Sequence, residues 1–330
     1  MKNIRLILWT MIAIGAISCQ AQNDHIMQEK KNPLLCDPQI GICEVPSSNT
    51  ALAQADAVSA RQKPIKIVYF TDPICSSCWG IEPQLRKLKL EYGGDVEIEY
   101  RMGGLLPDWS YNSGGISKPS DVASHWDEVS LYYNMPIDGD IWLEDPLDSS
   151  YPPSIAFKAA QMQDKHKAVA FLRVLRELLF LQKKNITRWE YVVQAAEKTG
   201  LDTAQLRIAI EGKAKELFQE DLQLARRMGV RGFPTLFLSD STGATEMLYG
   251  FKPYEQFEEK LRKIKPAITA MDYHHDWKQL FEIYPTLTLR EFAEVAELPL
   301  ATAQQKLDEL HGQGELSLIS CKNGKLWLRE

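Results

Sequence analysis

Two cysteines separated by two residues, Cys75 and Cys78, are the feature of this sequence best suited to chemistry. They follow a short apolar run at 65–70 and precede a segment of helical periodicity from Trp79 to Tyr92. Cys75 would therefore begin a helix, where unpaired backbone N–H groups and the helix dipole stabilise a thiolate. Cys78, one turn later, would resolve a mixed disulfide formed at Cys75. We expect thiol–disulfide exchange at this pair.

Three side chains near the pair have candidate supporting roles. Asp72 is expected to cap the turn before the helix, and the alternative is that its carboxylate relays protons to a thiol. Trp79 is expected to pack or to contact a client protein rather than to take part in catalysis. Glu82 would either tune Cys78 from the next turn or be an ordinary exposed helix residue.

A second marker lies far downstream, where Phe233 and Pro234 come directly before an apolar run at 235–238. A proline that enters a strand needs a special backbone conformation. A cis bond between Phe233 and Pro234 would provide it, and would place a backbone edge beside the dithiol for an extended client segment. The alternative is an ordinary turn with a trans proline.

The other cysteines are Cys19, Cys36, Cys43 and Cys321. Asp-Pro and Gly between Cys36 and Cys43 favour a tight turn, so these two thiols could meet as a second disulfide. Two unpaired thiols in a flexible arm are an equally weighted alternative. Cys321 is expected to be a small buried residue rather than a redox partner. No metal site and no cofactor are expected.

The apolar patterns predict an α/β fold in which sheet segments flank a block of helices. Strand 65–70, a helix and strand 96–102 follow one another, which favours a parallel sheet. Residues 103–152 are rich in Gly, Pro, Ser, Trp and Tyr, and are expected to be irregular. The remaining expectations are helices at 168–183, 190–198, 203–211, 217–228 and 253–264, and strands at 235–238 and 247–250.

Residues 276–330 form a distinct tail with two helical segments, 288–296 and 300–312. Two short strands, 315–319 and 325–328, surround Asn323-Gly324, which is a strong hairpin signal. This order predicts a winged-helix-like unit. From residue 280 onward it has eight acidic and five basic residues, and the whole chain has a formal net charge of -6. These charges argue against nucleic acid as a partner and favour protein contact.

The segment Phe70-Thr71-Asp72-Pro73-Ile74-Cys75-Ser76-Ser77-Cys78-Trp79, the helical block and Val230-Arg231-Gly232-Phe233-Pro234-Thr235 together resemble the DsbA family of thiol-disulfide oxidoreductases. Within it, the chain looks like the FrnE-type isomerases and the YjbH-type adaptors, which deliver a transcription factor to the ClpXP protease. The resemblance implies a thioredoxin-like fold at 64–270, with a helical insertion at about 108–217. It makes Cys75 the nucleophile, Cys78 the resolving thiol and Pro234 the cis-proline. Ser76-Ser77 departs from the dipeptide common in the family.

The resemblance gives two expectations for function. The first is an enzyme, a protein-disulfide oxidoreductase or isomerase, whose partners are client thiols and disulfides and an unidentified redox partner. The alternative is an adaptor that binds a client protein and lies in the cytoplasm if translation starts at Met27.

The first 21 residues resemble an export signal because a basic start precedes an apolar run of about a dozen residues. Small residues before Cys19 predict a lipoprotein cleavage site with Cys19 lipidated, and cleavage after Ala21 is an alternative. Residues 22–63 are expected to be a linker. The first expectation is therefore a periplasmic protein that meets the membrane only through a lipid anchor.

Overall fold

A computed structural model describes residues 36–37, 42–44, 63–110 and 118–329. The expectations for the export signal, Cys19, Met27 and most of the linker fall outside these residues. Four strands form the central sheet in the order β4-β3-β6-β7. They are β3 (Ile65–Thr71), β4 (Val96–Met102), β6 (Thr235–Asp240) and β7 (Thr245–Tyr249).

The sheet is mixed rather than parallel. β3 pairs in parallel with β4, as expected, but β6 pairs antiparallel with both β3 and β7. β3 and β6 are the inner strands of this sheet. The apolar residues of β3 are buried on both faces: Ile65, Ile67, Tyr69 and Phe70 have no exposed surface. Tyr69 lies opposite Tyr100 of β4, and their ring centroids are 5.2 Å apart.

Two helices follow β3 where one was expected. α1 (Ser76–Gly80) begins three residues earlier than Trp79, and α2 (Glu82–Tyr92) follows after a break at Ile81. Pro83 explains the break, because proline lacks the N–H that a continuous helix requires but is favoured in a first turn. α10 (Tyr254–Ile264) contacts β6 and β7.

The helical block lies between β4 and β5 (Gly232–Phe233) in the chain. Its helices are α3 (Ser120–Tyr133), α4 (Ile141–Glu144), α5 (Tyr151–Gln163), α6 (Lys165–Gln182), α7 (Trp189–Lys198), α8 (Thr203–Glu211) and α9 (Lys213–Arg227). The expectation that 103–152 is irregular is wrong, since α3 and α4 lie there. Val122, Trp126, Val129 and Tyr133 of α3 are buried at helical spacing.

Buried Asp221 ties this block to the sheet. Its carboxylate accepts from the Arg101 side chain at 2.7 Å and from the Met102 backbone N–H at 3.0 Å, both at the end of β4. Lys158 of α5 completes the cluster with its Nζ atom 2.7 Å away. α9 and α5 are therefore fixed to the strand by charge as well as by packing.

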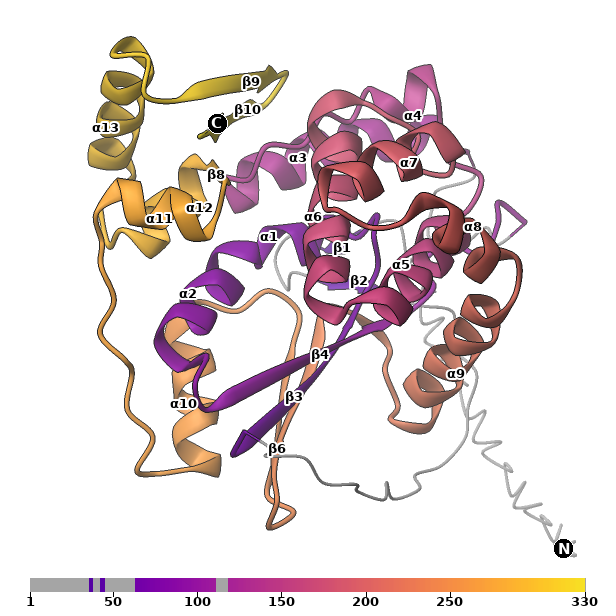
Figure 1. The fold of residues 1–330 in the computed structure, drawn as a ribbon, viewed down its shortest axis with the longest axis horizontal. Helices are drawn as coiled ribbons and strands as arrows, with labels where there is room; N and C mark the ends of the chain where they lie inside the picture. Colours follow the sequence, from indigo (N-terminus) through magenta and orange to yellow (C-terminus); the bar gives the residue numbers. More distant parts are fainter. Residues whose placement is uncertain (1–35, 38–41, 45–62, 111–117, 330) are drawn as a thin grey trace, which may run out of the picture. The chain divides into compact units, whose positions relative to one another are not determined.

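The C-terminal elements pack around their own apolar cluster, which includes Phe292, Leu307 and Trp327. They comprise α11 (Trp277–Ile283), β8 (Thr286–Thr288), α12 (Leu289–Val295), α13 (Leu300–Gly312), β9 (Ser317–Cys321) and β10 (Gly324–Leu328), with strand order β8-β10-β9. The two expected helices and the hairpin are confirmed, whereas α11 and β8 were not foreseen. These elements, coloured from orange at α11 to yellow at β10 in Figure 1, contact the rest of the chain chiefly where α12 meets α2.

A third sheet is small and joins distant parts of the sequence. β1 (Cys36–Asp37) pairs with β2 (Ile42–Glu44), and β2 pairs with β5. Within the described ranges, no helix has the length and apolar character needed to cross a membrane.

Candidate functional site

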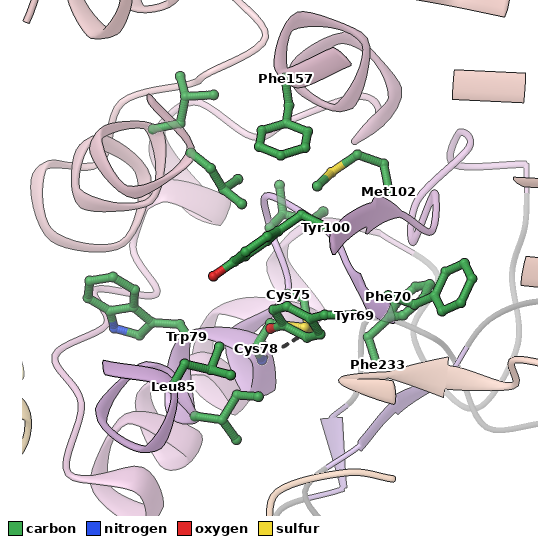
Figure 2. Packing of buried hydrophobic residues seen from close by; sticks show 14 of the residues in the cluster. Tyr69, Phe70, Cys75, Cys78, Trp79, Leu85, Tyr100, Met102, Phe157 and Phe233 are labelled. Carbon is green, nitrogen blue, oxygen red and sulfur yellow. Dashed lines mark hydrogen bonds between the residues drawn. A yellow bond between two sulfur atoms is a disulfide. The ribbon is translucent and has the colours of Figure 1, made fainter. Parts of the chain in front are cut away.

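Cys75 and Cys78 lie at the start of α1, directly after the central strand β3. Cys75 is the N-cap residue, and its sulfur accepts from the backbone N–H of Cys78 at 3.1 Å. The two sulfurs are joined as a disulfide with Cα atoms 5.2 Å apart. The expected placement at a helix start is thus confirmed. Neither residue has exposed surface, and Figure 2 shows them beside the ring of Tyr69.

Asp72 is a buried structural centre beside the dithiol. Its carboxylate accepts from the backbone N–H of Ile74 at 3.1 Å, which is the turn-capping role expected. It also accepts from the Leu105 N–H at 2.8 Å and the Ser150 hydroxyl at 2.9 Å. Burial raises the pKa of Asp72 to about 6, although these hydrogen bonds act to lower it. Asp72 therefore fixes the loop after β4 and the start of α5 against the dithiol turn.

Phe233 and Pro234 lie where the sequence placed them, between β5 and β6. The bond between them is cis, as expected. The Phe233 ring is fully buried, and Figure 2 labels this residue among the buried residues of the core cluster. Gly103, directly after β4, leaves room for this ring because a Cβ atom there would overlap it.

Arg176 of α6 reaches the turn before the dithiol. Its Nη2 donates to the Thr71 hydroxyl at 2.7 Å and to the Asp72 carbonyl at 3.1 Å. Its Nη1 lies 2.6 Å from the carboxylate of Glu82. Glu82 is consequently the partner of a buried arginine, so of its two predicted roles that of an ordinary exposed helix residue is wrong. Sequence reasoning missed Arg176 because nothing local relates it to β3, which lies more than a hundred residues earlier.

Trp79 is a packing residue. It has no exposed surface, and its Nε1–H donates to the Pro136 carbonyl at 3.1 Å. The ring lies 5.5 Å from that of Phe180, and the guanidinium of Arg173 lies 4.3 Å from its centroid. Of the two expected roles, packing is the one that the contacts support.

Arg173, which lies over Trp79, also forms an ion pair with Glu291 of α12 in the C-terminal elements. Glu291 has no exposed surface, and Arg86 of α2 also lies 3.0 Å from its carboxylate. Burial alone would raise the pKa of Glu291, but the charges of Arg173 and Arg86 outweigh it and hold that pKa below its usual value. Glu291 also forms a capping box with Thr288 at the start of α12. A single carboxylate thus joins α2, α6 and α12.

A cavity of about 680 Å³ lies beside this network. β4, α2, α6 and the segment from Ile283 to Thr286 contribute to its lining. Several of its charged groups are already paired with one another, including Arg173 with Glu177 at 2.7 Å. Among the described residues, no group of three or more His, Cys, Asp or Glu side chains could hold a metal ion.

The remaining predicted cysteines lie in two different places. Cys36 and Cys43 are direct partners in the register of β1 and β2, and Cys43 is also the register partner of Phe233. Cys321 is partly buried in β9, and burial raises its thiol pKa. The structure therefore brings the Cys36–Cys43 pair, but not Cys321, to the strand before Pro234.

Comparison with known proteins gives a family match and full-length relatives. The sequence model described as thioredoxin matches residues 69–259. The cytosolic disulfide reductase DsbM from Pseudomonas aeruginosa matches with a TM-score of 0.50 and 20% identity, over 60% of this chain and 99% of its own chain. 

Two relatives named ClpXP adapter protein SpxH match more of the chain. The protein from Halalkalibacterium halodurans is 33% identical over 91% of this chain and 99% of its own length. The protein from Bacillus subtilis is 29% identical over 81% of this chain and 89% of its own length.

The fold and the family match define a thioredoxin-like protein, which confirms the expected fold class. Within that class, the chain belongs to the family of the proteins named ClpXP adapter protein SpxH. This result contradicts the first expectation for function, an enzyme acting on protein disulfides, and favours its alternative, a protease adaptor. The thioredoxin-like fold defines the architecture of the chain, but a fold alone does not determine function.

Proposed function

We propose that this chain is an adaptor that binds a client protein and brings it to the ClpXP protease. The observation that carries the proposal is the extent of the match to the adaptor from Halalkalibacterium halodurans. A match over 91% of the chain cannot leave out all of residues 277–328. The disulfide reductase, by comparison, covers 60% of the chain. The adaptor thus shares more than the thioredoxin-like part.

The burial of the dithiol also supports binding over catalysis on clients. A thiolate that attacks an external disulfide must be reached by the client's sulfur. Cys75 and Cys78 have no exposed surface. The contacts around the dithiol are structural instead. Arg176 of α6 donates to the turn before the dithiol, and Arg173 of the same helix lies over Trp79.

An adaptor must share a compartment with its protease, so the proposal includes a cytoplasmic protein whose translation starts at Met27. Mass spectrometry of the N-terminal peptide, in the organism that encodes the chain, tests this part. A peptide beginning at Met27 supports it, whereas a lipid-modified Cys19 would overturn it.

The adaptor activity is tested in two stages. Protein half-lives are measured in cells that lack this chain and in cells that lack ClpX, and the proteins stabilised in both are identified. One such protein is then purified and incubated with ClpXP, ATP and the full chain. We expect ATP-dependent degradation to accelerate when the chain is added and to be unchanged in reactions with ClpP alone. The proposal fails if no half-life depends on both genes.

A further inference from the structure

The strand β2 is a neighbour of two elements of the dithiol site, β5 and α1. It pairs antiparallel with β5, with Cys43 opposite Phe233 and Glu44 opposite Gly232. Cα atoms of β2 also lie within 8 Å of Cα atoms in α1, the helix that Cys75 begins. β2, which precedes the dithiol by more than thirty residues in the sequence, is therefore a neighbour of both the strand before Pro234 and the dithiol helix.

This position is the one that an extended client segment would take. The backbone edge of β5 can pair with an added strand, because strand edges present N–H and C=O groups that seek partners. In this chain β2 already makes that pairing. The chain's own segment thus occupies the edge of β5 that a client would use, close to α1, the helix that carries Cys78.

The occupying segment has its own pair of cysteines in register. Cys36 of β1 lies directly opposite Cys43 of β2. Opposite residues in antiparallel strands have Cα atoms about 4.5 to 5.5 Å apart, and disulfides span Cα distances of roughly 4.4 to 6.8 Å. The register therefore suits a disulfide between Cys36 and Cys43.

We propose that Cys36–Cys43 is a second redox pair, which exchanges its disulfide with Cys75–Cys78 inside the same chain. β2, and not β1, pairs with β5, so the proposal assigns the attack on Cys75 to Cys43 rather than to Cys36. The proposal goes beyond the adaptor function and does not depend on it. It assigns no reaction to client disulfides.

The exchange balances without any external oxidant. Starting from the Cys75–Cys78 disulfide, the Cys43 thiolate attacks the sulfur of Cys75. The Cys43–Cys75 bond forms, the Cys75–Cys78 bond breaks, and its electron pair leaves on Cys78 as a thiolate.

The Cys36 thiolate then attacks Cys43, which forms Cys36–Cys43 and releases the thiolate of Cys75. The thiols of Cys36 and Cys43 are oxidised to a disulfide, the disulfide of Cys75 and Cys78 is reduced to two thiols, and two protons pass from the Cys36–Cys43 pair to the Cys75–Cys78 pair. Because both pairs belong to one chain, their effective concentration is high and the exchange can occur within a buried site.

The mixed disulfide can be trapped by removing the sulfurs that resolve it. We would prepare the full chain with Cys36→Ser and Cys78→Ser, replace reductant with oxidised glutathione as the oxidant, and identify linked peptides by mass spectrometry without reduction. The expected product is an intramolecular Cys43–Cys75 link. The matched control carries Cys43→Ser and Cys78→Ser. It keeps Cys36 as the remaining cysteine of the β1–β2 segment, and we expect the link to Cys75 to be lost.

Equal linkage in the two variants, or linkage of Cys75 mainly to Cys321 or to another molecule, would overturn the proposal. Hydrogen exchange of the unsubstituted chain gives a reading that no substitution can disturb. Protected amides at 42–44 support the pairing of β2 with β5. Exchange there at the rate of an unfolded peptide refutes the pairing, and with it the proposal.

Discussion

Both terminal nitrogens of the Arg173 guanidinium in α6 donate hydrogen bonds to the buried carboxylate of Glu291 in α12, Nη1 at 2.5 Å and Nη2 at 3.0 Å. The same guanidinium lies over the ring of Trp79, the residue after Cys78. The C-terminal elements are therefore connected by one side chain to the helix that carries the dithiol.

Replacing Glu291 should destabilise the chain strongly. In Glu291→Gln the guanidinium groups of Arg86 and Arg173 lose a buried counter-charge, and breaking a buried pair typically costs about 3–5 kcal/mol. Urea unfolding should show a lower free energy of unfolding by roughly this amount. The matched control is Glu216→Gln, which removes the exposed partner of Lys213 and should change stability little. Similar effects of both substitutions would contradict the assignment of Glu291.

Asp72 should make the chain less stable as pH rises from 4 to 6. Its folded pKa, about 6, lies above its ordinary value of 3.8, so over this range the folded chain keeps a proton that the unfolded chain releases. The resulting stabilisation is fully present below pH 4 and is lost as pH rises through 6. A shift of about two units corresponds to about 3 kcal/mol.

The observable is the difference between the wild type and Asp72→Asn, because other carboxylates such as Glu291 shift the opposite way. Urea unfolding between pH 4 and pH 7 should show a steeper loss for the wild type by about that 3 kcal/mol. Carbon NMR of the Asp72 carboxyl provides a direct check. Titration near pH 4 would disprove the argument.

Gly103→Ala should destabilise the chain because the new methyl group would meet the ring of Phe233. Overpacking of this kind costs about 1–3 kcal/mol. The matched control is Gly312→Ala, at the end of α13, where a Cβ atom would meet nothing within 4 Å. It should be neutral or slightly stabilising, since alanine favours helix over glycine. Thermal unfolding of both variants tests the comparison, and a harmless Gly103→Ala would show that the ring moves freely.

Cys321 should react slowly in the folded, reduced chain. Burial raises its pKa, so little thiolate is present near neutral pH. Iodoacetamide labelling followed by peptide mass spectrometry should modify Cys321 much more slowly in the folded chain than in urea. Equal rates in both states would mean that the β9–β10 hairpin leaves this thiol open.

Local patterns predicted the elements around the dithiol well. The apolar runs 65–70 and 96–102 and the position of Pro234 were sufficient for β3, β4 and the cis bond. The same approach failed at α3, whose buried residues have helical spacing but lie in a segment dominated by Gly, Pro and Ser. Composition was weighed there in place of periodicity.

The ion network could not be predicted in the same way. Arg176 and Glu82 are 94 residues apart, and Arg173 and Glu291 are 118 apart. Charged residues at such separations give no local signal, since pairing depends on how the helices fold together. The first expectation for function failed for a related reason: Cys75 and Cys78 identify an architecture, whereas a relative that matches 91% of the chain is named an adaptor.

Two sets of ion pairs join the C-terminal elements to the rest of the chain. One is Glu291 against α2 and α6, and the other is Lys322, whose Nζ atom lies 2.5 Å from Asp127 and 2.8 Å from Asp140. Ion pairs at two separate places restrict the orientation of the C-terminal elements more than ion pairs at a single place would. A partner that binds β9 and β10 would therefore be separated from α1, the helix that carries Cys78, by a single helix, α3.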